Sequence, residues 1–384
     1  MKYPKHLLVI GDKKFDIGNN FSLEEDFDTN FQTLTFEFPY IDTPHFKTTD
    51  IKKYDSCQLY FNWFNSAEER DAALIDDMVQ CIYGYIDSYT RSESKESGLN
   101  YNITVKSTFG LAFERSAERS SFKGNIETIT TWMLQSSSVI NYLNGINYKG
   151  LSKGFEIKAD TSKFPGVVLK SFSEKYAINV FQTGDGILRV WTPLYMLQQD
   201  VNVYEYDLET NIFNIDYGDG QNNVDCVIVH GIGNSGVAFD PIAIQLKYNL
   251  DLLPTPETID QGLLNPLHIE RRDLHSETDC QKVAQEKMVE LGRNYTITIS
   301  TEYNPSQFLG DMFVIKNSLI IPETQKWIIK KRSVTITKDN IECSIVAYSN
   351  SVTDFPDNIL ISQTGILDTD MLDVTDKVTF PGFP

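Results

Sequence analysis

The chain has 384 residues, a formal net charge of −19, and 53 acidic against 34 basic side chains. Its length allows a large buried core and favours two or three domains over one. Its acidity excludes a broad nucleic-acid-binding surface, because phosphate contacts need clustered Lys and Arg, and it disfavours anionic membranes. Solubility is the simplest explanation of the charge, with a basic partner or a surface that repels passing DNA as alternatives.

The N-terminal region, residues 1–117, is predicted to be β. It begins with a short apolar run that ends at Gly11-Asp12, which is too short for a signal peptide and is typical of a strand followed by a hairpin turn. In "FQTLTFEFPY" the apolar residues alternate with others, as on one face of a strand. Two further strands are expected over 79–88 and 100–106, joined by a polar loop over 91–98. No apolar run approaches the length of a membrane span.

The next region, residues 118–223, is predicted to be mixed α+β. Apolar residues recur near helical spacing in "NIETITTWMLQSSSVINYLN", although its Ser run argues against one long helix. Further on, "SFSEKYAINVFQTGDGILRVWTP" indicates a helix and then two strands. Gly184-Asp185-Gly186 stands between these strands, and a D-G turn between two apolar runs is a strong hairpin signal.

Residues 224–350 are predicted to return to β with one helix over 276–292. Ser276 is a suitable N-cap, with Asp279 in the capping-box position three residues later. Gly292 suits the position just after the helix. The segments "YTITIST", "GDMFVI", "WIIKKRSVTI" and "IECSIVAYS" then predict further strands.

The stretch "VDCVIVHGIGNSGVAF" resembles a strand that runs into Gly231-x-Gly233-x-x-Gly236, the spacing of a dinucleotide-binding fingerprint. A dinucleotide site needs a helix to begin at the third glycine. Pro241 would fall in the first turns of that helix, and the residues after it alternate as in a strand. We therefore interpret the glycines as a loop after a strand, and we predict no cofactor.

No other pattern of catalytic or metal-binding residues is complete. A nucleophile elbow around Ser235 would need glycine where Val237 stands. The five histidines are scattered without H-E-x-x-H, and "NIDYGDGQNNVD" fails the EF-hand spacing. The five cysteines show no C-x-x-C and mostly stand beside apolar residues, so we expect buried free thiols. We predict no catalytic and no metal-binding residue.

Taken in order, four stretches resemble the phage tail-hub family, which includes the baseplate hubs of contractile tails, the late control protein D group and the siphophage tail-associated proteins. Gly84, Ile86 and Asp87 fill a Gly-x-Ile/Val-Asp pattern in the first stretch. "SFSEKYAINVFQTGDGILRVW" is similar to the helix and hairpin of the family's middle domain. "YDLETNIFNIDYGDGQNNVDCVIVHG" is similar to the segment that leads out of that domain. The last stretch looks like the second barrel, with Gly310 and Asp311 at its Leu-Gly-Asp turn.

The resemblance implies a mainly β fold, with two hub-type antiparallel β-barrels, an inserted α+β middle domain and a short C-terminal arm. At the return to the barrels, Gly231, Gly233 and Gly236 would let the backbone turn sharply. The expected units are 1–117 for the first barrel with 224–250 as its candidate completion, 118–223 for the middle domain, 224–350 for the second barrel with helix 276–292, and 351–384 for the arm.

The resemblance also implies a non-enzymatic structural role in the virion, at the tail tip or baseplate, after assembly in the host bacterial cytoplasm. Hub proteins of this family are homotrimers whose barrels form a ring that matches the hexameric tail tube. The implied partners are a distal tail protein ring or the tail tube, the tape measure protein, receptor-binding proteins, and DNA in transit through a channel. A carbohydrate-active cell-wall-degrading β protein and a glycan-binding adhesin are the alternatives.

Overall fold

Most of the described chain is β-strand, which confirms the predicted mainly β fold. The computed structural model describes residues 3–349 except 16–20, 44–45, 95–97, 118–121, 152–156, 160–162, 177, 199–202, 220–223, 233–237, 247–264, 272–273, 292–294, 320 and 338–340. The predicted C-terminal arm therefore lies outside the described residues.

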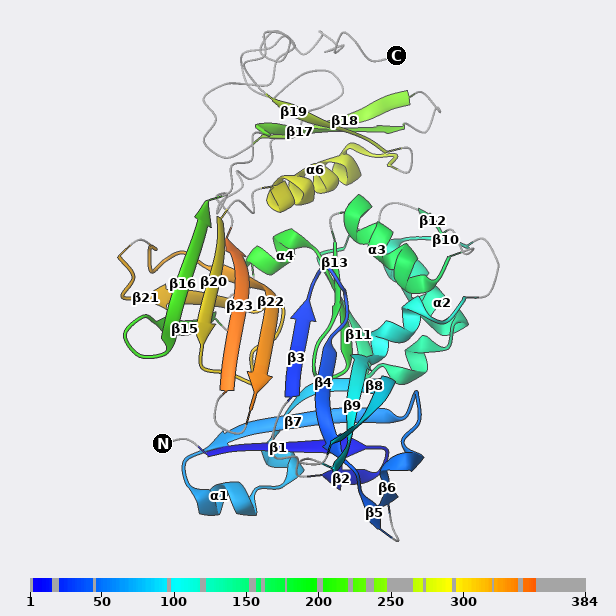
Figure 1. Ribbon diagram of the computed structural model, residues 1–384. Helices are drawn as coiled ribbons and strands as arrows, with labels where there is room; N and C mark the ends of the chain where they lie inside the picture. Colours follow the sequence, from blue (N-terminus) through cyan, green and yellow to red (C-terminus); the bar gives the residue numbers. More distant parts are fainter. Residues whose placement is uncertain are drawn as a thin grey trace, which may run out of the picture.

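One large curled sheet forms the body of the molecule (Figure 1). Its strands lie in the order β16-β20-β23-β22-β3-β4-β9-β8-β7-β1-β2, and β21 joins it beside β22 and carries β15 parallel to it. The N-terminal half supplies β1 (Tyr3–Ile10), β2 (Lys13–Phe15), β3 (Phe21–Asp26), β4 (Thr33–Pro39), β7 (Ser56–Phe64), β8 (Val79–Ser94) and β9 (Gly98–Ser107). The C-terminal half supplies β15 (Val203–Asp207), β16 (Ile212–Asp219), β20 (Tyr295–Thr301), β21 (Met312–Lys316), β22 (Trp327–Ile336) and β23 (Ile341–Ser349).

Short elements connect the N-terminal strands. They are the two-stranded sheet β5 (Asp42–Thr43) with β6 (Phe46–Lys47), the helix α1 (Ala67–Ala72), and the 3-10 helices η1 (Thr48–Asp50), η2 (Ile75–Asp77) and η3 (Thr108–Phe113). The last of these, η3, leads from β9 into the middle region.

Local patterns in the sequence account for the first strands. In β4, Leu34, Phe36 and Phe38 are buried and the residues between them are exposed, as the alternation predicted. The predicted turn between β1 and β2 is confirmed, with Gly11 at φ +61°. Burial of each large apolar side chain contributes about 1.5–3 kcal/mol, so this face of β4 is fixed toward the core.

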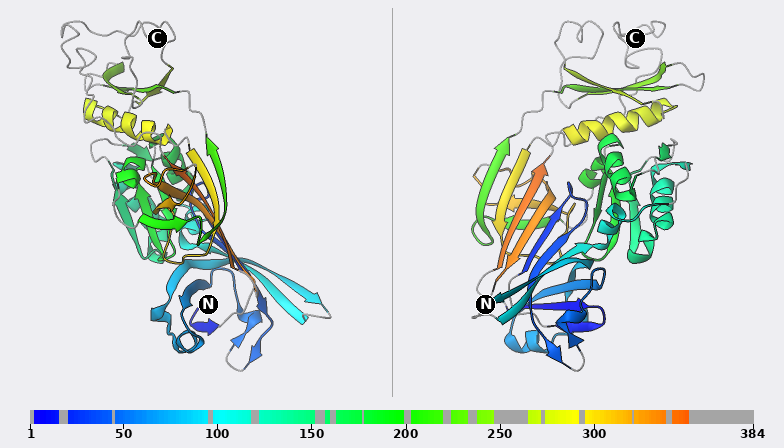
Figure 2. Two further views of the ribbon diagram at one scale, coloured as in Figure 1. Left: turned by 90° about the vertical axis from the view of Figure 1, so that its left-hand side faces the viewer. Right: turned by 45° about the vertical axis from the view of Figure 1, so that its right-hand side comes forward.

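The β8–β9 hairpin is longer than predicted. The two strands pair from Gly84 with Ser107 out to Ser94 with Gly98, so the loop predicted over 91–98 is wrong. The outer part of the hairpin extends away from the body of the molecule (Figure 2), and its side chains from residue 88 to 93 are exposed. A strand exposed in this way has no buried face, and therefore its sequence carries no apolar alternation.

The two halves of the chain meet where β3 pairs with β22, seen as blue beside orange in Figure 1. Side chains from both halves share one hydrophobic core, which includes Leu8 and Phe61 as well as Trp327 and Ile345. Strands of both predicted barrels thus belong to one sheet, and the domain boundaries stay a prediction.

A region with both helices and strands follows β9, whereas β15 and β16, which also fall in the predicted unit 118–223, belong to the main sheet. This region contains a three-stranded sheet in the order β11-β14-β13, in which β13 and β14 form the predicted hairpin and β11 runs parallel to β14. The Asn125 side chain accepts from Thr128 N and caps α2, which ends at the Ser run. The elements are β10 (Phe122–Gly124), α2 (Ile126–Ser136), η4 (Val139–Tyr142), β11 (Gly145–Lys149), β12 (Ile157–Ala159), α3 (Pro165–Tyr176), β13 (Asn179–Gln182), β14 (Ile187–Trp191) and α4 (Pro193–Gln198).

The Gln182 side chain fixes this middle region to the main sheet. Its Nε2 donates to the Tyr83 carbonyl oxygen at 3.0 Å, and its Oε1 accepts from Phe109 N at 2.6 Å. Gln182 is fully buried, so these bonds are shielded from water. Two residues further on, Gly184 packs directly against the backbone of β8.

A third group of elements comprises β17 (Cys226–Ile232), β18 (Ala238–Leu246), β19 (Pro266–Glu270) and the helix α6 (Glu277–Leu291). The strands form a separate sheet in the order β18-β17-β19, and α6 lies between this sheet and the middle region in Figure 1. The predicted helix is confirmed, and Ser276 Oγ accepts from Asp279 N at 3.2 Å as its cap. The next described element after β17 is the antiparallel strand β18, where a dinucleotide-binding site would need a helix.

All five cysteines are free and buried, as predicted: Cys57, Cys81, Cys226, Cys280 and Cys343. In the part of the chain that the structure describes, no helix is long and apolar enough to cross a membrane.

We expect Gly184→Ala to lower the free energy of unfolding by about 1–3 kcal/mol, because an added methyl group would overpack the contact with β8. Its Cβ would lie 2.5 Å from the carbonyl oxygens of both Gln80 and Cys81, where rigid backbone cannot yield easily. Gly218→Ala is the control, because Gly218 lies on the edge strand β16 and its Cβ would meet first the rotatable hydroxyl of Thr296. Urea denaturation of both variants measures the difference, and equal losses would contradict this account.

Candidate functional site

An ion pair is buried where β3 meets β22. Glu25 and Arg332 face each other directly in the strand register, and each side chain is 1% exposed. Arg332 Nε donates to Glu25 Oε2. Both residues occupy inward positions of alternating strands, so the sheet geometry carries both charges into the core.

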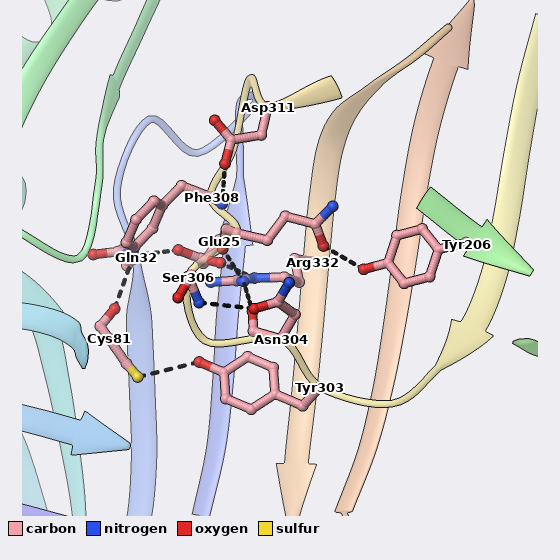
Figure 3. A network of polar contacts seen from close by, with 11 residues as sticks. Glu25, Gln32, Cys81, Tyr206, Tyr303, Asn304, Ser306, Phe308, Asp311 and Arg332 are labelled. Atoms are coloured by element: carbon pink, nitrogen blue, oxygen red, sulfur yellow. Dashed lines mark hydrogen bonds and ion pairs between the residues drawn. The ribbon is translucent and has the colours of Figure 1, made fainter. Parts of the chain in front are cut away.

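A wider set of polar groups bonds to this pair (Figure 3), although Arg332 Nη2 is buried and has no hydrogen-bond partner among the described residues. Gln32 Nε2 donates to Glu25 Oε1 and also reaches the Cys81 carbonyl oxygen at 3.2 Å. Arg332 Nη1 donates to the carbonyl oxygens of Asn304 and Gln307, at 3.1 Å in the case of Asn304. The ion pair therefore ties the loop before β21 to both β3 and β22.

The surroundings keep Arg332 charged. Burial is the largest single influence and acts to lower the pKa of its guanidinium, but Glu25, Tyr303 and Cys343 together raise it by more, so that the pKa lies above the ordinary Arg value. The Tyr303 ring lies 5.3 Å from the guanidinium carbon, and its hydroxyl donates to Cys81 Sγ at 3.2 Å. Burial raises the pKa of the Cys81 thiol to about 12, so the thiol is neutral at physiological pH.

The predicted Gly310–Asp311 turn lies at the end of this same loop. Gly310 has φ +83°, in the left-handed region that favours glycine, and its N–H donates to the Ile329 carbonyl oxygen at 3.0 Å. A Cβ at Gly310 would lie 3.1 Å from the Phe181 ring and 3.2 Å from Met196 Cε. The turn therefore forms the contact between the main sheet and the middle region.

Asp311 holds the loop closed. Its Oδ2 accepts from Phe308 N at 2.8 Å. Burial raises the pKa of the Asp311 carboxyl to about 6, and the Phe308 N–H together with the more distant Arg189 and Arg332 charges partly oppose that rise.

Gly84 and Asp87, the other predicted pair, lie together on β8. An added Cβ at Gly84 would lie 2.2 Å from the Lys106 carbonyl oxygen, so only glycine allows β9 to approach this closely. Asp87 lies at an irregularity of the β8–β9 register, and its carboxylate contacts Lys106 Nζ at 3.1 Å and Lys53 Nζ at 3.5 Å.

Glu114 completes the cluster around Asp87. Its carboxylate accepts from Tyr85 OH at 3.2 Å and from Tyr54 OH at 3.1 Å, and it lies 3.6 Å from Lys106 Nζ. These contacts connect the end of η3, where the chain enters the middle region, to β8 and β9. The charged side chains are partly exposed, so each pair adds little stability by itself.

The third predicted set is only partly described. Gly231 is buried on β17, and a Cβ there would lie 2.7 Å from the Leu274 carbonyl oxygen and 2.9 Å from Cys280 Sγ. It therefore belongs to the contact between β17 and the start of α6. Gly233 and Gly236 lie outside the described residues.

The sequence analysis missed the centre of the junction, Glu25 and Arg332. The available signal was the position of each charge on the apolar face of an alternating segment, in "FSLEED" and "KKRSVTI". The ion pair is closed off from solvent and its groups bond to one another, which suits a structural role. Among the residues described, no group of three or more His, Cys, Asp or Glu side chains could hold a metal ion.

No protein-family model and no curated protein matches this sequence. Solved structures match its fold. The tail protein from Neisseria meningitidis MC58 has a TM-score of 0.63 at 12% identity, over 91% of this chain and 97% of that one. The 43 kDa tail protein of prophage MuSo2 from Shewanella oneidensis has a TM-score of 0.60 at 11% identity, over 92% of this chain and all of that one.

A third similar structure is the c3393 protein of E. coli, a component of the type VI secretion system with structural similarity to the T4 bacteriophage tail proteins gp27 and gp5. It has a TM-score of 0.52 at 9% identity, over 93% of this chain and 80% of that one. The chain thus has the fold of phage tail proteins along nearly its whole length, which confirms the resemblance seen in the sequence.

We expect Arg332→Met and Glu25→Met each to lower the free energy of unfolding by about 3–5 kcal/mol, because each leaves a buried charge without its partner. The double variant should lose less than the sum of the two, with a coupling of about 1–3 kcal/mol. Lys331→Met is the control, since Lys331 only approaches Asp26 at 3.7 Å on the partly exposed face and should cost at most about 1 kcal/mol. Urea denaturation of the four variants gives these values, and additive losses would count against a coupled pair.

Asp311 should make stability depend on pH. Its folded pKa, about 6, lies above the ordinary value of 3.8, so its stabilising contribution is complete below about pH 4 and is lost as the pH rises through 6. Asp311→Asn removes the titration and keeps an oxygen that can accept from Phe308 N. The difference in the free energy of unfolding, wild type minus variant, should therefore fall by up to about 3 kcal/mol between pH 4 and pH 7. A difference that stays constant over this range would refute the assignment.

Proposed function

We propose that this chain is a structural, non-enzymatic component of a phage tail tip or baseplate. It acts as a homotrimeric hub that adapts the hexameric tail tube to the tip and closes or lines the DNA exit channel. The observation that carries the proposal is the similarity in fold to two tail proteins over 97% and 100% of their lengths.

The contacts between the two halves of the chain support a role as a rigid structural component. Strands from both halves of the chain form one sheet, and the Glu25–Arg332 pair and the Gly310 turn connect that sheet to the middle region. A hub has to keep its shape while a tube and a tip pull on its two ends. Buried polar groups that bond to one another across β3 and β22 favour one arrangement of the strands over slipped alternatives.

The charge of the chain supports the proposed contact with DNA only in transit. A net charge of −19 would repel a polyanion from a channel wall and leave it free to slide. The proposed partners are a distal tail protein ring or the tail tube above the hub, the tape measure protein, and receptor-binding proteins at its periphery. The proposed location is the virion.

The protein should form a trimer in solution. A hub that contributes two barrels from each chain needs three chains to match a hexameric tube. Light scattering during size-exclusion chromatography should give the mass of three 43.8 kDa chains, and negative-stain images should show rings. The measurement should cover a range of protein concentrations, since the assembly depends on mass action. A compact monomer at every concentration tested would rule out the hub, although it would leave the fold unaffected.

A further inference from the structure

A cleft of about 550 Å³ lies where the main sheet, the middle region and α6 meet. Its walls come from the turn between β3 and β4, from α3 and the start of β13, and from residues of β20, β22 and β23. Charged and polar side chains from elements far apart in the sequence converge there. The contacts already described for the ion pair and for Asp87 do not involve this cleft.

Asn30 gives the cleft an unsatisfied hydrogen-bond acceptor. Its side chain is 4% exposed, and its Nδ2 donates to the Val180 carbonyl oxygen at 2.7 Å, which fixes the orientation of the amide. Its Oδ1 is buried and has no hydrogen-bond partner among the residues that the structure describes. A buried acceptor of this kind is costly unless a donor, a water molecule included, reaches it, so an N–H or O–H group at this wall is favourable.

Two lysines give the cleft a cationic side. Lys330 Nζ lies 3.0 Å from Asp28 Oδ2, and Lys170 Nζ donates to the Asp28 carbonyl oxygen at 3.2 Å. The other acid in the wall, Glu290, already pairs with Lys287 at 2.9 Å. Each ammonium has three donors, so both lysines can bind a further carboxylate. In a chain this acidic, such a site favours an acidic ligand with free N–H groups, which is the chemistry of an acidic peptide.

We propose that this cleft is the docking site of the chain's own residues 350–384. That segment follows directly on Ser349, the last residue of β23, and the preceding Tyr348 lines the cleft. It carries six Asp and one Lys, so its charge complements the lysines, and its backbone supplies N–H donors for Asn30 Oδ1. The covalent link to β23 keeps the local concentration of the segment high, so individually weak contacts suffice to hold it. The proposal does not depend on the hub function.

Photo-crosslinking of the full-length protein tests the proposal directly. A benzophenone amino acid replaces Ser173, which lines the cleft from α3, and mass spectrometry identifies the crosslinked peptides. We expect crosslinks to residues 350–384 of the same chain, and mixing with isotope-labelled protein distinguishes these from crosslinks to a second copy. Crosslinks to a second copy, to another segment, or to no segment would overturn the proposal.

Charge reversal provides an independent test. Lys170→Glu combined with Lys330→Glu should speed cleavage of residues 350–384 by a protease specific for Asp by about tenfold, because two attractions become repulsions. The control is Lys13→Glu with Lys47→Glu, which changes the net charge equally at exposed lysines that pair with Asp12 and Asp42 away from the cleft. Peptides released from the segment are followed by mass spectrometry. Equal cleavage rates in the two double variants would contradict docking at the lysines.

Discussion

The cross-strand pair of Glu25 and Arg332 determines how the two halves of this chain fit together. The residues are 307 positions apart, yet they lie directly opposite each other in adjacent strands. A slip of one residue would turn the apolar face of either strand outward, and a slip of two would leave a charge buried without its partner. An apolar pair of similar volume could fill the same space, but it would not distinguish the register as sharply.

The position of the middle region follows from the same junction. Arg332 holds the loop that ends at Gly310, and Gly310 packs against Phe181 of the β13–β14 hairpin. On the opposite side, Gln32 bonds to the Cys81 carbonyl oxygen, against which Gly184 of the same hairpin packs. The hairpin is therefore held from two sides by groups whose places are set by the pairing of β3 with β22. The register of the main sheet therefore also determines where the middle region sits.

Sequence reasoning found the features whose cause is local. The apolar face of β4, the Ser276 cap and the Gly184 turn each depend on residues a few positions apart. The pairing of β3 with β22 depends on a partner in the other half of the chain, and in a single sequence Glu25 and Arg332 resemble ordinary surface charges. The outer β8–β9 hairpin was mistaken for a loop because a strand with no buried face lacks alternation. The family resemblance indicated Gly84 and Asp87, which lie on β8, and the turn at Gly310 and Asp311, without the contacts that explain them.

Those residues share a physical property that explains why loose motifs carried the resemblance. A shared fold at about a tenth identity means that most core positions accept any apolar side chain of suitable volume. Gly84 accepts no other side chain, because a Cβ would lie 2.2 Å from a backbone oxygen. Gly310 favours glycine because its φ is +83°. The aspartates beside them, Asp87 and Asp311, each hold the neighbouring segment through one carboxylate. At positions where the backbone geometry tolerates only one residue type, a short sequence pattern can indicate the fold even when the rest of the sequence has diverged.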